Sequence, residues 1–193
     1  TPQKRPYVDL QINGHRETWP IDSVDFYEWY AKEHYKETGG ILSESTLKSI
    51  MNHLKGCAKF EGECHEVFLR CAKVGDSIVI DRCDENWQAI VISKEGYKII
   101  DTPPVRFWRS ENMEALPIPK DGSIERLWEF VSVKDKKDRA LVTVLILASW
   151  CPDLVSPILE LLGVAGANKS SSQRFLVQII DPTSIPLLIN PKS

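Results

Sequence analysis

The residues best suited to chemistry form a glycine-containing loop near the end of the chain, with one lysine followed by serines. The loop reads Gly163-Val-Ala-Gly-Ala-Asn-Lys-Ser170, and Ser171 follows it. Such a loop at the start of a helix can bind phosphate, because unpaired backbone N–H groups and the helix dipole favour an anion there. Glycines let the backbone approach the phosphates, and a lysine adds positive charge beside them. The pattern therefore predicts a P-loop, also called a Walker A motif.

The predicted cofactors are ATP and Mg²⁺, held by backbone and side-chain groups of this loop. We expect Lys169 to reach the β- and γ-phosphates, and the Ser170 hydroxyl to bind Mg²⁺. The full set of predicted cofactor-binding residues is Gly163, Gly166, Ala167, Asn168, Lys169, Ser170 and Ser171. The sequence assigns no catalytic residue.

One position departs from the usual motif, which is Gly, four free positions, Gly, Lys, and then Ser or Thr. Asn168 stands where the second glycine is expected. Asparagine adopts a left-handed backbone more readily than other non-glycine residues, so the loop geometry is still available. The alternative interpretation is an ordinary glycine turn whose serines cap a helix.

The segments around the loop are those that a P-loop requires. The apolar run Pro157–Leu162 predicts a buried parallel strand, and Ser170–Ile180 has helical spacing. Asp181 lies too close to Lys169 to end the separate strand that would supply a second Mg²⁺ ligand, so we expect it to end the helix. Ile185–Ile189 then predicts the next strand.

The first 116 residues of the chain predict an α+β accessory domain. Tyr7–Ile12 and His15–Pro20 flank Asn13-Gly14, a strong hairpin turn signal. An amphipathic helix follows the cap at Asp22 or Ser23 and stops at Gly39, and a second runs from Ser43 to near Gly56. The strands of an antiparallel meander are then expected at Glu66–Cys71, Ser77–Asp81, Ala89–Ser93 and Tyr97–Asp101.

A linker is predicted at residues 117–122, which hold two prolines and a glycine. After it we expect a short helix capped by Ser123, a charged turn or helix start at 134–139, and an apolar helix from Arg139 to Trp150. The predicted organisation is an accessory domain at 1–116 (hairpin, two helices, meander), followed at 123–193 by the start of an α/β P-loop ATPase domain.

A nucleic-acid contact is predicted at Val105–Arg109. In an extended chain Arg106 and Trp108 share one face, and a tryptophan stacked on a base with an arginine on a phosphate is typical of single-strand binding. Arg16 with Trp19 is a weaker version of the same pattern. The alternative is a strand whose aromatic side chains fill the edge of the domain.

Composition limits the remaining classes of protein. The net charge of −3 argues against a strongly basic chain that coats nucleic acid. The longest apolar run, Ala140–Trp150, is shorter than the roughly 20 residues that span a bilayer, so we expect no membrane insertion. An odd number of irregularly spaced cysteines, five in all, favours reduced thiols and a cytoplasmic location.

With these residues identified, the chain resembles a family of phage and mobile-element ATP-binding proteins related to the ATPase modules of primase-helicases. The motifs that carry the resemblance are Gly14-His-Arg-Glu-Thr-Trp-Pro20, Trp29, Trp87, Gly96-Tyr97, Pro104-Val-Arg-Phe107, Arg109, Met113, Leu116-Pro117, Pro157-Ile-Leu-Glu-Leu161, the P-loop and Ile180–Leu188. The resemblance implies an accessory domain before a helicase-like ATPase that acts in DNA replication, with single-stranded DNA as a partner and an oligomer of the full-length ATPase.

The chain departs from that family in two ways: Asn168 replaces a small residue, and the ATPase domain is cut after its first strand–helix–strand unit. This end and the absence of Met at Thr1 favour a fragment. We therefore expect the chain alone to bind ATP weakly and not to hydrolyse it, because arginine finger, sensor and acidic motif are missing. The alternative function, which the sequence leaves open, is a non-catalytic DNA-binding or assembly module with a vestigial P-loop.

Overall fold

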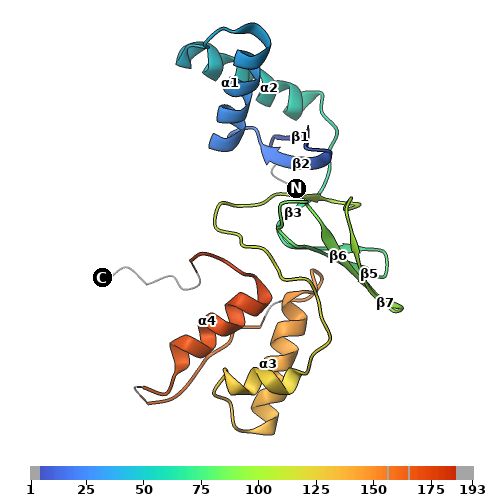
Figure 1. Ribbon diagram of the computed structural model, residues 1–193, viewed down its shortest axis with the longest axis vertical. Helices are drawn as coiled ribbons and strands as arrows, with labels where there is room; N and C mark the ends of the chain where they lie inside the picture. Colours follow the sequence, from blue (N-terminus) through green and yellow to red (C-terminus); the bar gives the residue numbers. More distant parts are fainter. Residues whose placement is uncertain (1–4, 156, 165, 186–193) are drawn as a thin grey trace. The chain divides into compact units, whose positions relative to one another are not determined.

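The computed structural model of the protein describes residues 5–155, 157–164 and 166–185 (Figure 1). It combines antiparallel strands with several helices, which confirms the predicted α+β class. The contacts divide the chain into two compact units. Unit 1 consists of residues 5–69 and Pro104–Arg109, and unit 2 consists of Arg70–Pro103 and residues 110–185. Within these described ranges, no helix is long and apolar enough to cross a membrane.

Unit 1 begins with the predicted hairpin. Strand β1 (Tyr7–Ile12) pairs antiparallel with β2 (His15–Pro20). Asn13 and Gly14 both have positive φ, 49° and 86°, as a tight two-residue hairpin turn requires. The predicted hairpin and its Asn13-Gly14 turn are therefore confirmed.

Two capped helices follow the hairpin. Helix α1 (Val24–Thr38) begins after Ser23, whose side chain accepts from the Phe26 N–H, and it ends at Gly39 with a left-handed backbone. Helix α2 (Glu44–Phe60) begins after Ser43 in the same way. The predicted end near Gly56 is wrong, because a glycine inside a helix costs only about 1 kcal/mol and packing of the helix offsets it.

The core of unit 1 lies between the hairpin and these helices. Leu10, Ile21, Phe26 and Met51 are buried there together. A short parallel pair completes the unit: β3 (Val67–Phe68) lies beside β8 (Arg106–Phe107).

The predicted strand Glu66–Cys71 is wrong as a single element. Its first part is β3, which pairs with β8, whereas its last residue, Cys71, begins a different strand. Because the two parts pair with different partners, the strand is interrupted at Leu69 and Arg70.

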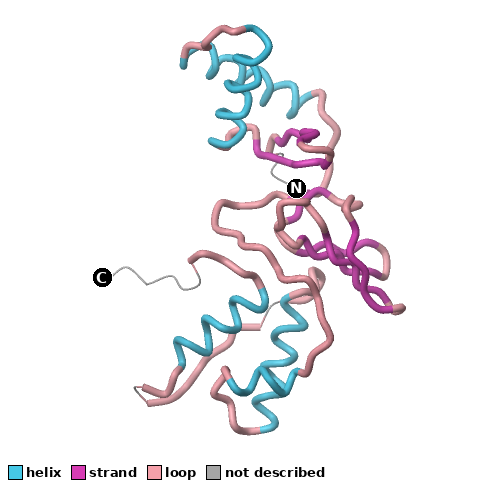
Figure 2. Tube along the Cα trace, in the orientation of Figure 1, coloured by secondary structure: helices cyan, strands magenta, loops and turns pink. Residues whose placement is uncertain are grey.

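The predicted antiparallel meander forms one part of unit 2. Its strands pair in sequence order, β4 with β5, β5 with β6 and β6 with β7 (Figure 2, magenta). Their bounds are β4 Cys71–Val74, β5 Ser77–Asp81, β6 Ala89–Ser93 and β7 Gly96–Ile100. Ile80 and Ile90 pair across the sheet and are buried with Leu116, so the irregular segment that contains Leu116 also packs against the meander.

The helices of unit 2 surround a second apolar cluster. A 3₁₀ helix, η1 (Ile124–Glu129), follows the predicted cap at Ser123, and α3 (Lys136–Ser149) begins after Asp135. Helix α4 runs over Lys169–Ile180. Side chains from all three elements and the turn after η1 form the cluster: Leu127, Val131, Val142, Ile146 and Leu176.

The predicted linker does not coincide with the boundary between the compact units. Residues 110–116 belong to unit 2, and the Leu116 N–H donates to the Arg82 carbonyl at 2.7 Å. The independence of 1–116 and 123–193 as domains therefore remains a prediction.

Candidate functional site

The glycine loop leads directly into α4, with a left-handed backbone at the position that departs from the motif. Asn168 has φ 58° and ψ 22°, and Gly166 has φ 80°. The Ala167 N–H donates to the Val164 carbonyl at 3.2 Å, which closes a turn inside the loop. The expectation that asparagine can adopt the backbone usually given to glycine here is thus confirmed.

The Lys169 side chain folds back over the loop instead of extending into solvent. Its ammonium nitrogen donates to the carbonyls of Gly163 at 2.7 Å and Val164 at 2.8 Å. A Cβ built on Gly163 would lie 3.2 Å from the Ala167 Cβ and 4.0 Å from the Lys169 Nζ. The ammonium therefore lies against the backbone of the loop, and a side chain at position 163 would be tight against the Ala167 Cβ rather than against the ammonium.

The first turn of α4 is open to an anion. The Asn168 side chain makes no capping hydrogen bond, and Ser170 and Ser171 are exposed. Backbone N–H groups in the first turn of a helix have no partner within the helix. Ser172 is different, because it is buried and its hydroxyl accepts from the Ser132 N–H at 3.2 Å. The predicted ligands thus lie together in the described part of the loop and the first turn of α4. They are Gly163, Gly166, Ala167, Asn168, Lys169, Ser170 and Ser171.

The apolar run before the loop is not the strand that the sequence predicted. No strand forms at the described residues 157–164, and Ile158 and Leu162 are 98% and 83% exposed. A parallel strand obtains its backbone hydrogen bonds from neighbouring strands. Within the described ranges no strand pairs with this run, so it has no regular structure and most of it is exposed.

Asp181 ends α4, as predicted. It is the C-cap residue, and its N–H donates to the Val177 carbonyl. The helix from Lys169 to Ile180 places it roughly 18 Å from the loop. Its carboxylate pairs with Arg70 at 2.7 Å, so Asp181 lies far from Ser170 and in a contact of its own.

Sequence reasoning missed Arg70 entirely. It lies between two short strands, and its contacts reach more than 100 residues along the chain. No periodicity or spacing marks such a residue. Only the apolar run to either side, at Val67–Leu69 and Cys71–Ala72, could have indicated that an arginine there is buried.

The predicted nucleic-acid residues have partners within unit 1. Arg106 forms an ion pair with Asp9 at 2.8 Å, and the Arg5 guanidinium lies over the Trp108 ring at 4.9 Å. Arg16 donates to the Val105 carbonyl at 2.9 Å. A nucleic acid would have to compete with these contacts, and its binding remains a prediction.

The last predicted strand, Ile185–Ile189, lies outside the described residues except for Ile185. Within the described ranges, no group of three or more histidine, cysteine, aspartate or glutamate residues is placed to hold a metal ion. The predicted Mg²⁺ ligand, Ser170, is a hydroxyl and belongs to a different kind of site.

No protein-family model, curated protein or solved structure matches the chain.

Proposed function

We propose that the loop from Gly163 to Ser171 binds the phosphates of ATP, in a helicase-like replication ATPase of the kind found in phages and mobile elements. The observation that carries the proposal is the position of Lys169. Its ammonium is held inside the loop by two backbone carbonyls, next to the open first turn of α4. Loop, lysine and helix start thus converge on one small volume.

The proposed binding step is an exchange of partners at Lys169. In the structure, its ammonium donates to the neutral carbonyls of Gly163 and Val164. Phosphate oxygens are charged acceptors, and hydrogen bonds between two charged groups are roughly twice as strong as neutral ones. The ammonium therefore forms stronger hydrogen bonds when phosphate replaces the carbonyls. The first-turn N–H groups of α4 bind the same anion.

Mg²⁺ belongs to this site through Ser170. Its hydroxyl is exposed in the first turn of α4, directly after Lys169. Hydroxyl oxygens are acceptable ligands for a hard cation, which usually keeps several waters. Ser170 would hold the ion, which would neutralise part of the phosphate charge.

A second candidate function is an assembly module with a vestigial loop. The observation that favours it is the exposed apolar run with Ile158 and Leu162, because uncovered apolar segments often mark protein–protein contacts. In that case the glycine loop is only a helix cap. Both proposals include single-stranded DNA as a partner and a cytoplasmic location. The proposed oligomer is that of the full-length ATPase.

A series of nucleotides with decreasing numbers of phosphates tests the proposal. We expect titration calorimetry to show saturable binding of ATP and ADP in the presence of Mg²⁺, and much weaker binding of AMP, because the loop contacts the β- and γ-phosphates. Free tripolyphosphate should compete with ATP. Equal affinities for ATP and AMP would show that the loop does not bind phosphates.

A further inference from the structure

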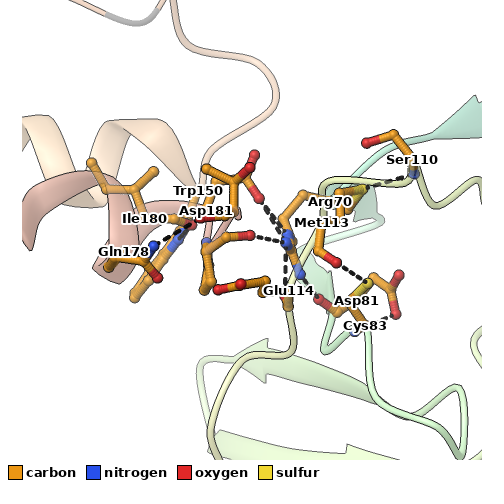
Figure 3. Close-up of polar contacts among 12 residues, drawn as sticks. Arg70, Asp81, Cys83, Ser110, Met113, Glu114, Trp150, Gln178, Ile180 and Asp181 are labelled. Carbon is orange, nitrogen blue, oxygen red and sulfur yellow. Dashed lines mark hydrogen bonds and ion pairs between the residues drawn. The ribbon is translucent and has the colours of Figure 1, made fainter. Parts of the chain in front are cut away.

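Arg70 is a buried cation at the C-terminal end of α4 (Figure 3). Arg70 is the residue directly before strand β4 of the meander, and only 6% of it is exposed. Its Nε and Nη2 atoms lie 2.8 and 2.7 Å from the same Asp181 carboxylate oxygen. Nη2 also donates to the Pro182 carbonyl at 3.2 Å. The guanidinium is therefore bound to the two residues that follow the helix.

The same guanidinium is bound to the sheet side of unit 2. Nη1 donates to the Asp81 carbonyl at 3.3 Å, and Nη2 donates to the Glu114 carbonyl at 3.1 Å. Asp81 ends strand β5 of the meander. A single side chain thus connects the end of α4 with the meander and with the irregular segment around Glu114. A cation there also complements the negative end of the helix dipole.

Other contacts hold this end of the helix. The Trp150 indole N–H donates to the Ile180 carbonyl at 2.9 Å, and the Glu114 N–H donates to the Pro182 carbonyl at 2.9 Å. Met113 and Thr183 form an isolated antiparallel bridge. The segment after α4 is therefore bonded to residues 112–114 at several points.

The other end of α4 carries the loop and has few such bonds. Its first turn is bonded to the rest of unit 2 by the hydroxyl of Ser172, which accepts from the Ser132 N–H. Because a helix of this length is stiff, its anchored end sets the direction in which Lys169 and the loop are presented. Binding that needs no reordering of the loop is stronger than binding that does.

We propose that Arg70 is a positioning residue for the phosphate-binding loop: it fixes the C-terminal end of α4 to the meander and so pre-organises Lys169 at the opposite end. The inference rests on the proposed function, since it concerns affinity for nucleotide. Arg70 does not touch the ligand; it acts through the helix.

Two variants test the role of Arg70 in nucleotide binding. Arg70→Met removes the guanidinium, and Asp181→Ala removes its exposed anionic partner with little effect on burial. We expect affinity for a fluorescent ATP analogue with Mg²⁺ to fall on the order of tenfold in Arg70→Met, the size seen when residues that orient a ligand group are removed. The affinity should fall less in Asp181→Ala. The affinity of Arg70→Lys should lie between those of Arg70→Met and the wild type.

The matched control is Lys94→Met. It removes a cation from the same meander, where Lys94 pairs with Asp76 in an exposed turn remote in sequence from α4. Its nucleotide affinity should equal that of the wild type. The same loss in Lys94→Met would show that any change to the meander weakens binding, and it would overturn the specific role of Arg70.

Hydrogen exchange supplies a readout that needs no nucleotide. The Ser172 N–H donates to the Asn168 carbonyl in the first turn of α4. In Arg70→Met and Asp181→Ala we expect this amide to exchange several-fold faster, whereas the Val79 amide in the meander keeps its rate. A general loss of stability would instead accelerate both amides together.

The outcomes separate the two proposals. If the wild type shows no saturable nucleotide binding, the phosphate site is wrong and the positioning role is wrong with it. A second outcome is that the wild type binds nucleotide while Asp181→Ala and Arg70→Met both bind it as tightly as the wild type does. In that case the positioning role alone is wrong. Should Arg70→Met fail to fold, Asp181→Ala decides by the same two measurements.

Discussion

At the residue scale, the loop depends on backbone conformations that few residues adopt. Asn168 lies in the left-handed region, where a Cβ is unfavourable and asparagine is the best-tolerated side chain after glycine. Gly163 is favoured for another reason, since a Cβ there would lie 3.2 Å from the Ala167 Cβ, which is a tight contact. The departure from the usual motif at Asn168 is therefore compatible with the loop.

Substitutions at Asn168 should follow backbone preference. We expect Asn168→Gly to bind ATP as well as the wild type or better, because glycine adopts this conformation freely. Asn168→Val should destabilise the loop by about 1–3 kcal/mol, because a β-branched residue is strained at positive φ. Nucleotide titration of the two variants checks this, and equal affinities would show that the backbone at 168 is unimportant.

At the element scale, the helices were predictable from the sequence, whereas the strand predicted before the loop does not form in the described residues. Caps such as Ser23, Ser43 and Ser123 act on adjacent residues, so their effect can be inferred locally. A strand depends on a neighbour that can lie anywhere in the chain. The run Pro157–Leu162 has the composition of a strand, but no described strand pairs with it. Arg70 was missed for the same reason, because its partners are distant.

The packing of α4 against η1 and α3 should depend mainly on one buried side chain. Leu176 is 2% exposed in the cluster with η1 and α3, whereas the adjacent Phe175 is 41% exposed and stacks on Phe130. We expect Leu176→Ala to lower the free energy of unfolding by about 2–5 kcal/mol. Phe175→Ala should lower the free energy of unfolding by less than about 2 kcal/mol, although phenylalanine is larger than leucine. Urea denaturation measures both, and the reverse order would contradict this packing.

At the scale of the whole molecule, the compact units cut across the order of the sequence. Unit 1 takes in Pro104–Arg109 from far along the chain, and unit 2 contains the meander together with η1, α3 and α4. The sequence divides the chain at 117–122 because prolines and glycine mark a break there. Composition does not reveal which segments pack together, so the contacts of the meander with the last helix could not be predicted.

Limited trypsin digestion tests this organisation. Lys120 lies in the exposed stretch without regular structure after Leu116, and we expect an early cut there. The two fragments should then co-elute in gel filtration, because Arg70 binds Asp181 and Glu114 binds Pro182 across the cut. Fragments that separate freely at low salt would support independent domains at 1–116 and 123–193 instead.

The most direct test of the central claim is the affinity of Lys169→Ala for ATP with Mg²⁺, measured beside the wild type and Lys98→Ala. Lys98 is an exposed lysine of β7, so its loss changes the net charge equally and leaves the loop intact. We predict saturable binding by the wild type and Lys98→Ala, and loss of binding by Lys169→Ala, because the ammonium inside the loop is the main cation for the phosphates. Binding by Lys169→Ala with the affinity of the wild type would contradict the account and would leave the loop as a helix cap.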